Sequence, residues 1–417
     1  MPQKFARMRR RELDSRLLIL VTLALVAFGL VMVYSATSAA AAVGGQNPNY
    51  YLERQGIYGA LGILLMIVAQ RWDYRRLKAI APTLVLVTFV LLVAVLVIGP
   101  PINGARRWIS LGPAVFQPSE LAKLALAIWA AAYLSRKKAP RSLKELWRPL
   151  GATTCVFALL IVLEPDLGTT IALGVMLIGI LVVSGTPVRV LGAAIGIASG
   201  AGFAAIWMKP YSRARFFAFL HPTRDAAGTG YQILQAQIGM GSGHIFGVGL
   251  GQGVQKIFYL PEAHTDMMFA NIGEELGLVG VTAVIGAYAL FAYAGLDIAM
   301  RCKDPFGKHL AAGLTVLVCG QAAINILAVM GSAPLTGIPL PFLSYGGSSL
   351  VVLLAGVGIL LNIAHRGGTA AASVPDRSRG NGRTRAAGDR GRASADGARR
   401  ARDVRRVAGS GRSAARS

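Results

Sequence analysis

Apolar runs of about twenty residues recur along the chain and are separated by short polar segments. About twenty residues are needed for a helix to cross the hydrocarbon core of a bilayer, so this pattern predicts an all-α, polytopic membrane protein. We expect about ten transmembrane helices and one long extracytoplasmic loop. The proline-rich segment 334–341 is too broken for a helix and is expected to be re-entrant. The predicted spans are residues 17–37, 56–70, 79–99, 119–134, 150–163, 167–184, 188–208, 270–296, 310–331 and 345–364.

The distribution of basic residues predicts the orientation of these spans. Ten spans place both termini on one side of the membrane. The segments on that side, before the C-terminal tail, carry 20 Lys and Arg residues, whereas the short loops on the other side carry three. Five more lie in the long loop 209–265, which has little weight in the positive-inside rule. We therefore expect a multi-pass protein of the cell membrane with both termini in the cytoplasm.

Three regions follow from this topology. Residues 1–16 form a basic cytoplasmic N-terminus, residues 17–365 a membrane domain, and residues 366–417 an Arg-rich cytoplasmic tail that is expected to be disordered. The tail carries 14 of the 43 basic residues, so the net charge of +24 reflects topology and does not indicate nucleic-acid binding. The three cysteines have neither metal-site nor disulfide-framework spacing.

The candidate chemistry is concentrated in residues 239–277. This segment places Glu262, His264, Asp266, Glu274 and Glu275 close together in an otherwise apolar chain. Two interpretations of Asp266 are open: it or its neighbour caps the next helix, or its carboxylate is a general base. Of the adjacent acids in the apolar helix, one is expected to face inward, with a raised pKa or a neutralising cation. The histidine is a ligand, a hydrogen-bonding partner, or neither.

A glycine-dense stretch, residues 239–253, precedes this acidic cluster. Its backbone N–H groups are candidates for binding an anion, and the alternative is a flexible surface loop. The stretch does not match the P-loop pattern, nor does GxGxxG fit.

Further charged residues fall within or beside the predicted spans. Glu120 and Lys123 share one helix face, so they form either a structural ion pair or a site in which the lysine faces an anion. Asp166 is placed to cap the sixth span. Arg106 and Arg107, beside a tryptophan, suit phosphate recognition or snorkelling at the membrane boundary. In the long loop, Arg213 and Arg215 alternate with aromatic residues, as in an amphipathic segment on the membrane surface.

Several motifs together resemble the SEDS family (shape, elongation, division and sporulation). They occur in the same order as in that family, cover nearly all of residues 17–365, and leave the tail outside the resemblance. The motifs are GLVMVYSAT (29–37), NGARRWISLG (103–112), FQPSELAKLA (116–125), EPDLGTT (164–170), YLPEAHTDMMFANIGEELG (259–277) and GIPLPFLSYGGSSL (337–350).

The resemblance implies a ten-helix peptidoglycan glycosyltransferase that polymerises lipid II on the outer face of the cytoplasmic membrane. It implies undecaprenyl-diphosphate-linked glycan as the other substrate and a class B penicillin-binding transpeptidase, with other divisome proteins, as partners. YSAT and PEAHTD resemble the division member more than the elongation member. Asp266 matches the essential carboxylate of the family, where Met267 and Met268 replace the usual aromatic or branched residues. Glu120, Lys123 and Asp166 match further family positions.

The expected reaction is an inverting single displacement in which Asp266 removes a proton from the attacking sugar hydroxyl. We expect the charge of the leaving diphosphate to be offset by a divalent cation (Mg or Mn) or by basic side chains, with His264 nearby. The basic candidates are Arg106, Arg107, Lys123, Arg213 and Arg215. Glu274 and Glu275 are expected to support the site from behind. A lipid II flippase, or a non-enzymatic scaffold for the transpeptidase, remains an alternative.

Overall fold

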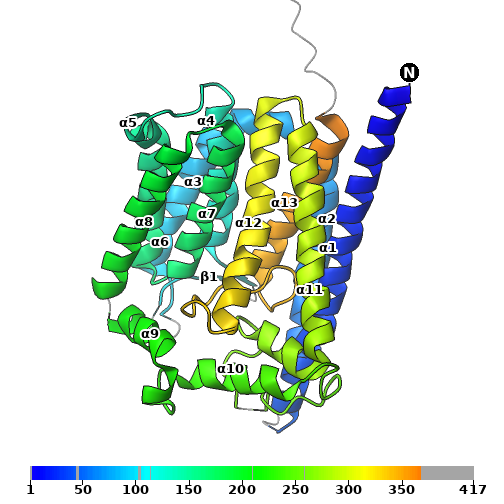
Figure 1. Ribbon diagram of the computed structural model, residues 1–417, viewed down its shortest axis with the longest axis vertical. Helices are drawn as coiled ribbons and strands as arrows, with labels where there is room; N and C mark the ends of the chain where they lie inside the picture. Colours follow the sequence, from blue (N-terminus) through cyan, green and yellow to red (C-terminus); the bar gives the residue numbers. More distant parts are fainter. Residues whose placement is uncertain are drawn as a thin grey trace, which may run out of the picture. The chain divides into compact units, whose positions relative to one another are not determined.

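The computed structural model describes residues 2–43, 47–101, 105–112, 114–208, 210–257 and 259–367 (Figure 1). Most of the predicted tail, from residue 368 onward, lies outside the described residues. The described helices and strands are α1 (Pro2–Val43), α2 (Tyr50–Arg71), η1 (Tyr74–Arg76), α3 (Leu77–Ile98), β1 (Ile109–Leu111), β2 (Ala114–Phe116), α4 (Pro118–Leu134), α5 (Leu143–Leu146), η2 (Trp147–Gly151), α6 (Ala152–Leu163), α7 (Leu167–Ser184), α8 (Val188–Met208), α9 (Pro210–Leu220), η3 (Pro222–Asp225), α10 (Tyr231–Ser242), α11 (Met268–Arg301), α12 (Pro305–Val329) and α13 (Gly347–Arg366).

The predicted polytopic class is confirmed. Within the described residues, nine helical segments are long and apolar enough to cross a membrane. The remaining predicted span, the fourth (119–134), corresponds to α4, which has 17 residues and is mostly buried. The boundaries moved most in the first span, predicted as 17–37 and found within α1 (Pro2–Val43), and in the fifth span, whose helical region begins at Leu143. The helix α11 extends beyond the predicted 270–296 to Met268–Arg301.

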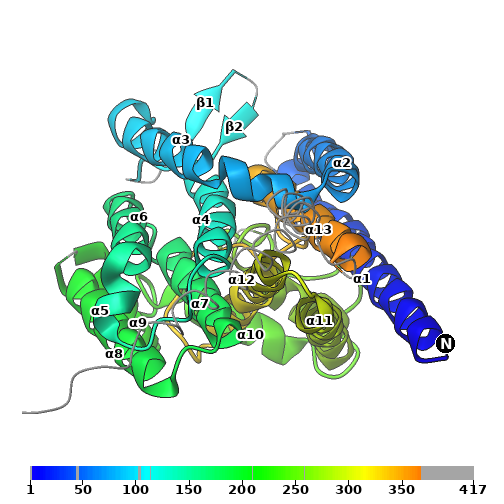
Figure 2. The same ribbon diagram turned by 90° about the horizontal axis from the view of Figure 1, so that it is seen from above.

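The spans pack around a buried centre. Figure 2 shows α4, α7 and α12 in the middle, with α1, α2 and α13 on one side and α5, α6 and α8 on the other. Small residues allow the close contacts: a Cβ atom at Gly313 of α12 would lie 2.7 Å from Ile180 of α7, and one at Gly62 of α2 would lie 2.5 Å from Leu354 of α13. Such contacts are typical of helices in lipid, where close packing replaces a hydrophobic driving force.

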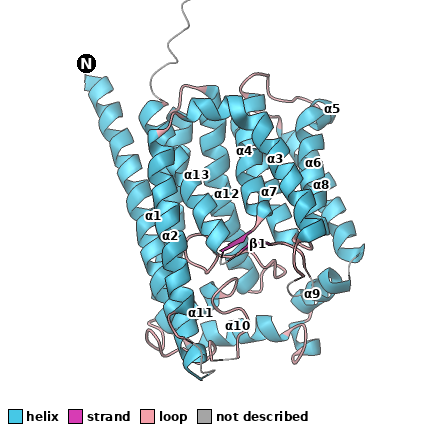
Figure 3. Cartoon of the chain, turned by 180° about the vertical axis from the view of Figure 1, so that it is seen from behind, coloured by secondary structure: helices cyan, strands magenta, loops and turns pink. Residues whose placement is uncertain are grey.

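A short β-hairpin, which the sequence did not predict, leads into α4. Its strands β1 and β2 pair antiparallel, with Ser110 opposite Val115 (Figure 3). The Ser348 hydroxyl at the start of α13 donates to the carbonyl oxygen of Val115 at 3.0 Å and accepts the backbone N–H of Gln117 at 3.1 Å. The hairpin therefore ties the beginning of α4 to the beginning of α13.

The long loop 209–265 contains two helices, and Figure 1 shows α9 and α10 lying across the end of the bundle opposite the start of α1. The loop between α12 and α13, residues 330–346, has no helix, as predicted for its proline-rich part. Its side chains at Ile338, Leu340, Phe342 and Leu343 are buried. We refer to residues 330–346 as the α12–α13 loop.

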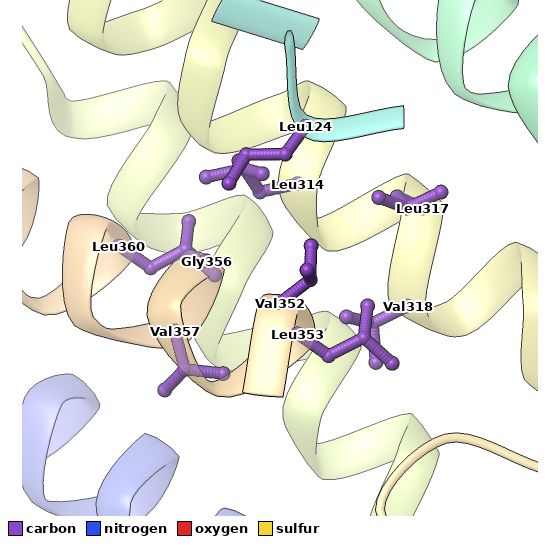
Figure 4. Close-up of a pocket in the computed structure, with 9 residues that line it drawn as sticks. All are labelled: Leu124, Leu314, Leu317, Val318, Val352, Leu353, Gly356, Val357 and Leu360. Atoms are coloured by element: carbon purple, nitrogen blue, oxygen red, sulfur yellow. The ribbon is translucent and has the colours of Figure 1, made fainter. Parts of the chain in front are cut away.

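Two cavities lie between spans and are lined almost entirely by apolar side chains. One, of about 10 Å³, is enclosed by α4, α12 and α13 (Figure 4). The other, of about 350 Å³, is an open groove between α3 and α6. Neither is lined by a charged side chain, so neither holds the candidate chemistry.

Candidate active site

Asp266 lies immediately before α11 and is buried, with 8% of its surface exposed. The N-cap residue of α11 is Met267, which makes no side-chain cap hydrogen bond, so the interpretation of Thr265 or Asp266 as the cap is wrong. The Thr265 hydroxyl lies 3.4 Å from Asp266 Oδ1 and 2.8 Å from a Glu262 carboxylate oxygen. The carboxylate of Asp266 is therefore left for a role other than starting the helix.

The backbone of Asp266 is held by Asn325 of α12. The Asn325 side-chain amide donates to the carbonyl oxygen of Asp266 at 2.7 Å and to that of Ile338 at 2.8 Å. All three groups are buried. One amide group thus joins the segment that carries the carboxylate to the α12–α13 loop.

Arg215 of α9 approaches the same place from the long loop. A Cβ atom at Gly337 would lie 3.7 Å from an Arg215 guanidinium nitrogen and 4.0 Å from Asp266 Oδ2. Gly337 has φ of +72°, a conformation that favours glycine. The guanidinium and the carboxylate therefore share one small space over the α12–α13 loop, whereas Arg213 is exposed on α9.

Burial raises the pKa of Asp266 to about 6, because the charged form loses solvation. The positive charge of Arg215 lowers this pKa and the negative charge of Glu262 raises it. A carboxylate with a pKa near 6 is ionised at neutral pH and is a stronger base than an ordinary aspartate. The arrangement suits removal of a proton from a substrate hydroxyl.

A second polar cluster surrounds Asp166. Its carboxylate accepts from the backbone N–H of Thr169 at 3.0 Å and from the Thr169 hydroxyl at 2.8 Å, which confirms the predicted cap of α7. The side-chain amide of Gln117 also donates to it at 3.3 Å. A Cβ atom at Gly168 would lie 2.6 Å from the carbonyl oxygen of Thr336. The start of α7 therefore packs against the same loop that lies beside Asp266.

Arg106 and Arg107 both bind carbonyl groups at helix ends. Arg107 donates to the carbonyl oxygens of Glu164, at 3.0 Å, and Pro165. Arg106 lies 3.2 Å from the carbonyl oxygen of Val97 at the end of α3. Their predicted role in phosphate recognition is not tested by these contacts.

Glu164, which the sequence analysis did not single out, is fully buried next to this cluster. Its carboxylate oxygens have no hydrogen-bond partner. Burial is the main cause that raises its pKa to about 8; Asp166 raises the pKa further and Arg107 lowers it. Among the described carboxyl groups, that of Glu164 is unusual because it is shielded from solvent and neither oxygen accepts a hydrogen bond.

The predicted pair of Glu120 and Lys123 is confirmed as an ion pair with 2.9 Å between Lys123 Nζ and Glu120 Oε1. The lysine side chain is fully buried and the glutamate nearly so, which agrees with the structural alternative. A role of Lys123 toward an anionic substrate remains a prediction.

The imidazole ring of His264 packs against the rings of Tyr51 and Tyr345, with 4.7 and 5.7 Å between ring centroids. Burial lowers its pKa.

Glu274 and Glu275 are both buried, and a lysine that the sequence analysis missed neutralises one of them. Lys256 Nζ lies 2.7 Å from Glu275 Oε1 and 3.0 Å from the Ser35 hydroxyl, which itself lies 2.7 Å from both Glu275 oxygens. A signal was present: Lys256 is the one basic residue between Arg224 and Arg301. Two acids in an apolar helix require such a partner.

The glycine-dense stretch binds carboxylates of its own chain. The N–H of Val254 donates to Glu274 Oε1 at 2.8 Å, and that of Gly251 donates to Glu275 Oε2 at 3.0 Å. The N–H groups of Val248 and Gly249 donate to the carbonyl oxygens of the same two glutamates, at 3.0 and 3.1 Å. The hypothesis that the stretch binds an external anion is therefore wrong for the N–H groups of Val248, Gly249 and Gly251, while Val254 directly follows the stretch.

No cluster of three His, Cys, Asp or Glu side chains in the described part of the chain is placed to hold a metal ion. The structure brings Asp266 and Arg215 together, with Asp166 and Arg107 beside the same loop. It places the Glu120–Lys123 pair and the Glu274–Glu275 pair separately within the bundle. Asn325 and Gln117 were missed, because a single amide in or beside an apolar run carries no recognisable pattern.

Comparison with known proteins identifies close relatives. The sequence profile of a family of cell cycle proteins, FTSW_RODA_SPOVE, matches residues 15–368. A protein of Geobacter sulfurreducens named "Probable peptidoglycan glycosyltransferase FtsW" is 40% identical over 352 residues, covering 84% of this chain and 94% of the relative. One of the same name from Trichlorobacter lovleyi is 41% identical over 360 residues, covering 85% and 94%.

Solved structures agree with this result. A chain from a structure described as "Structural coordination of polymerization and crosslinking by a peptidoglycan synthase complex" superposes with a TM-score of 0.70 at 32% identity, covering 84% of this chain and 96% of that one. The rod shape determining protein RodA of Thermus thermophilus superposes with a TM-score of 0.63 at 30% identity, covering 85% and 97%.

Proposed function

The chain belongs to the FtsW/RodA/SpoVE family of cell cycle proteins, and on that premise we propose that it polymerises lipid II into β-1,4-linked glycan strands with Asp266 as the general base. It is a peptidoglycan glycosyltransferase of the cell-division type, a multi-pass membrane protein whose relatives carry that name at about 40% identity over most of their length.

One structural observation carries the mechanism: a buried carboxylate that caps no helix and lies beside a guanidinium group. Asn325 holds Asp266 through its backbone carbonyl oxygen, and the Asp266 side chain does not cap α11. The carboxylate therefore does not serve to start the helix. Its raised pKa suits a base that is ionised at neutral pH. Glu164 is also buried near a guanidinium group, but its pKa of about 8 leaves it mostly protonated at neutral pH.

In the proposed step, Asp266 accepts the proton of the sugar 4-hydroxyl as that oxygen attacks C1 of the α-linked donor. The new C–O bond forms on the face opposite the diphosphate, whose bond to C1 breaks, and the product is β-linked. The electron pair of the breaking bond leaves with the lipid diphosphate. Arg215, with Arg213 on the same helix, offsets that charge. Arg106, Arg107, Lys123 and His264 remain candidates for contacts with the substrate.

A divalent cation (Mg or Mn) remains part of the proposal. With few described carboxylates grouped together, it would be held mainly by diphosphate oxygens, as Mg²⁺ often is. It would offset charge on the leaving group. Every step above is assigned to side chains of this chain.

The proposal includes orientation and partner. Both termini lie in the cytoplasm, because the basic residues of the short loops are on that side. Asp266 then faces the outer side, where lipid II is consumed. The partner is a class B penicillin-binding transpeptidase of the divisome. This is supported by the similarity to a chain from a peptidoglycan synthase complex.

The test is polymerisation of lipid II by the purified protein together with a transpeptidase partner. Asp266→Asn is expected to lower the rate by about 10²–10⁴-fold, the usual contribution of a general base. Glu262→Gln alters an exposed carboxylate of the same turn and is the matched control; because the charge of Glu262 raises the pKa of Asp266, activity is compared at pH 7.5, where Asp266 is ionised in both proteins, and should be retained. Wild-type rates for Asp266→Asn would refute the assignment of the base.

A further inference from the structure

Residues 243–255, which we call the glycine segment, combine a backbone that is largely hydrogen-bonded within the chain with an exposed apolar surface. The segment contains no Asp, Glu, Lys or Arg. Five of its side chains are large, apolar and exposed: Ile245 at 57%, Phe246 at 81%, Val248 at 43%, Leu250 at 51% and Val254 at 57%. A loop in water usually carries polar side chains, so this surface requires an explanation.

More than half of the backbone N–H groups of the segment are paired within the chain. Seven of its N–H groups have protein acceptors: those of Val248, Gly249, Gly251, Val254 and Gln255 go to Glu274 and Glu275, and those of Gly247 and Gln252 to the segment itself. This matters because an irregular backbone enters a lipid environment only if its polar groups are already paired. The buried carboxylates supply the acceptors that a helix would otherwise provide.

The segment continues the lipid-facing side of a transmembrane helix. α11 breaks at Gly277, and the N–H groups that follow, of Leu278 and Val279, donate to the carbonyl oxygens of His244 and Ile245 at 3.0 and 3.1 Å. Leu278 and Val279 are 56% and 51% exposed within a predicted membrane span. The apolar side chains of the segment and of α11 therefore form one adjoining surface.

We infer that the glycine segment inserts its apolar side chains, led by Phe246 and Leu250, into the lipid at the membrane boundary and anchors the end of the bundle that carries Asp266. The occupant of this surface is the bilayer itself. An aromatic side chain flanked by aliphatic ones, without charge, suits the boundary between headgroups and acyl chains. The Lys256–Glu275 ion pair fixes the segment to α11, and the Ser35 hydroxyl fixes it to α1.

This position has a consequence for the reaction. Asp266 follows Lys256 by ten residues, so the anchored segment sets the height of the carboxylate relative to the lipid boundary. That consequence rests on the proposed function, in which the reacting sugar is attached to a lipid. The depth of the segment can be measured without any reference to catalysis.

The experiment places a nitroxide on the full-length protein in bilayer nanodiscs and compares its collisions with oxygen and with a water-soluble nickel chelate. Cys155 is the exposed cysteine, so a Cys155→Ala background carries the label at Phe246→Cys or Leu250→Cys. Leu290→Cys, exposed on α11, is the lipid control. Thr223→Cys, exposed beside Arg224 and Asp225, is the water control.

Collisions with oxygen are expected to exceed those with nickel at positions 246 and 250, as at 290, and the reverse is expected at 223. A nickel-dominated signal at both test positions would place the segment in water and overturn the inference. A label shielded from both reagents would mean that protein covers the surface, which would also overturn it. All four labelled positions are exposed, so the substitutions leave the packing intact.

Discussion

The Asn325 side-chain amide donates to the backbone carbonyl oxygen of Asp266 at 2.7 Å, across 59 residues of sequence. The same nitrogen donates to Ile338 at 2.8 Å, so a single buried side chain connects α12, the candidate base and the α12–α13 loop. The position of the base is therefore determined by a residue that need not touch the substrate.

Asn325→Leu is expected to lower both the melting temperature and the polymerisation rate. The change leaves two buried carbonyl oxygens unpaired, at about 1–3 kcal/mol each. Gln321 is one turn earlier on α12, is buried, and its side-chain amide has no partner. Gln321→Leu should therefore leave the melting temperature unchanged or raise it. Equal losses in the two variants would contradict the role of the Asn325 hydrogen bonds.

The polymerisation rate is expected to depend on the ionisation of Asp266. The pKa of this carboxyl is about 6, and the base acts in its ionised form. The rate should therefore increase as the pH rises through about 6 and be constant above it. Arg215 lowers this pKa, so Arg215→Gln should move the midpoint of the pH–rate profile to higher pH. A midpoint that stays in place or moves to lower pH would argue against this electrostatic relationship.

Glu164 is expected to make stability fall as the pH rises. Its pKa is about 8 in the folded protein and 4.5 as the ordinary value, so the unfolded chain ionises first. Its contribution is fully present below pH 4.5 and is lost progressively up to about pH 8, at up to about 1.4 kcal/mol per pH unit. The melting temperature of Glu164→Gln should therefore exceed that of the wild type increasingly between pH 5 and 8.

The control for this comparison is Glu53→Gln, which alters an exposed glutamate of α2. The melting temperature of this variant should stay close to that of the wild type throughout. If Glu164→Gln also follows the wild type at every pH, Glu164 is not the buried acid that the structure describes.

The effects of substituting Lys256 and Glu275 on the free energy of unfolding are expected to be strongly coupled. Both side chains are buried, so Lys256→Met alone leaves an unpaired carboxylate and should cost about 3–5 kcal/mol. Adding Glu275→Gln removes the charge and retains an acceptor for the N–H of Gly251, so the double variant should regain most of the stability. Thermal unfolding of the two single variants and the double variant measures this. Additive losses would exclude coupling.

Gly277→Ala is expected to destabilise the protein. Gly277 has φ of +62° inside α11, and a Cβ atom there would collide with the backbone nitrogen of Gly247. Gly286 lies in the same helix, and a Cβ atom there would meet no neighbour within 4 Å. Gly286→Ala should therefore raise the melting temperature, since alanine is favoured over glycine in a helix by about 1 kcal/mol. An equal effect of both substitutions would show that the break in α11 is dispensable.

The sequence predicted the spans well because the length and apolarity of a membrane helix follow directly from the thickness of the bilayer. It predicted the Glu120–Lys123 pair and the Asp166 cap because their partners are three residues away. The β-hairpin was missed, since three-residue strands leave no periodic pattern. The boundaries of α1 and α11 moved because an apolar run does not mark how far a helix continues into the polar residues beside it.

The long-range contacts could not be predicted in the same way. Asn325 and Gln117 resemble isolated amides, and their acceptors lie 59 and 49 residues away. For residues 239–253 the sequence left open an anion site or a flexible surface loop, because it does not show which acceptors the N–H groups meet. The acceptors are Glu274 and Glu275, for which the sequence did not indicate a specific partner.

The α12–α13 loop touches the Asp266 segment through Ile338, the start of α7 through Thr336, and α2 through the carbonyl oxygen of Ser344, which accepts from Gln55. Three distant parts of the chain thus contact the same loop at fixed positions. A loop with this many neighbours has a fixed length: adding or deleting one residue between Thr336 and Ser344 would move at least one of the three attachments out of register.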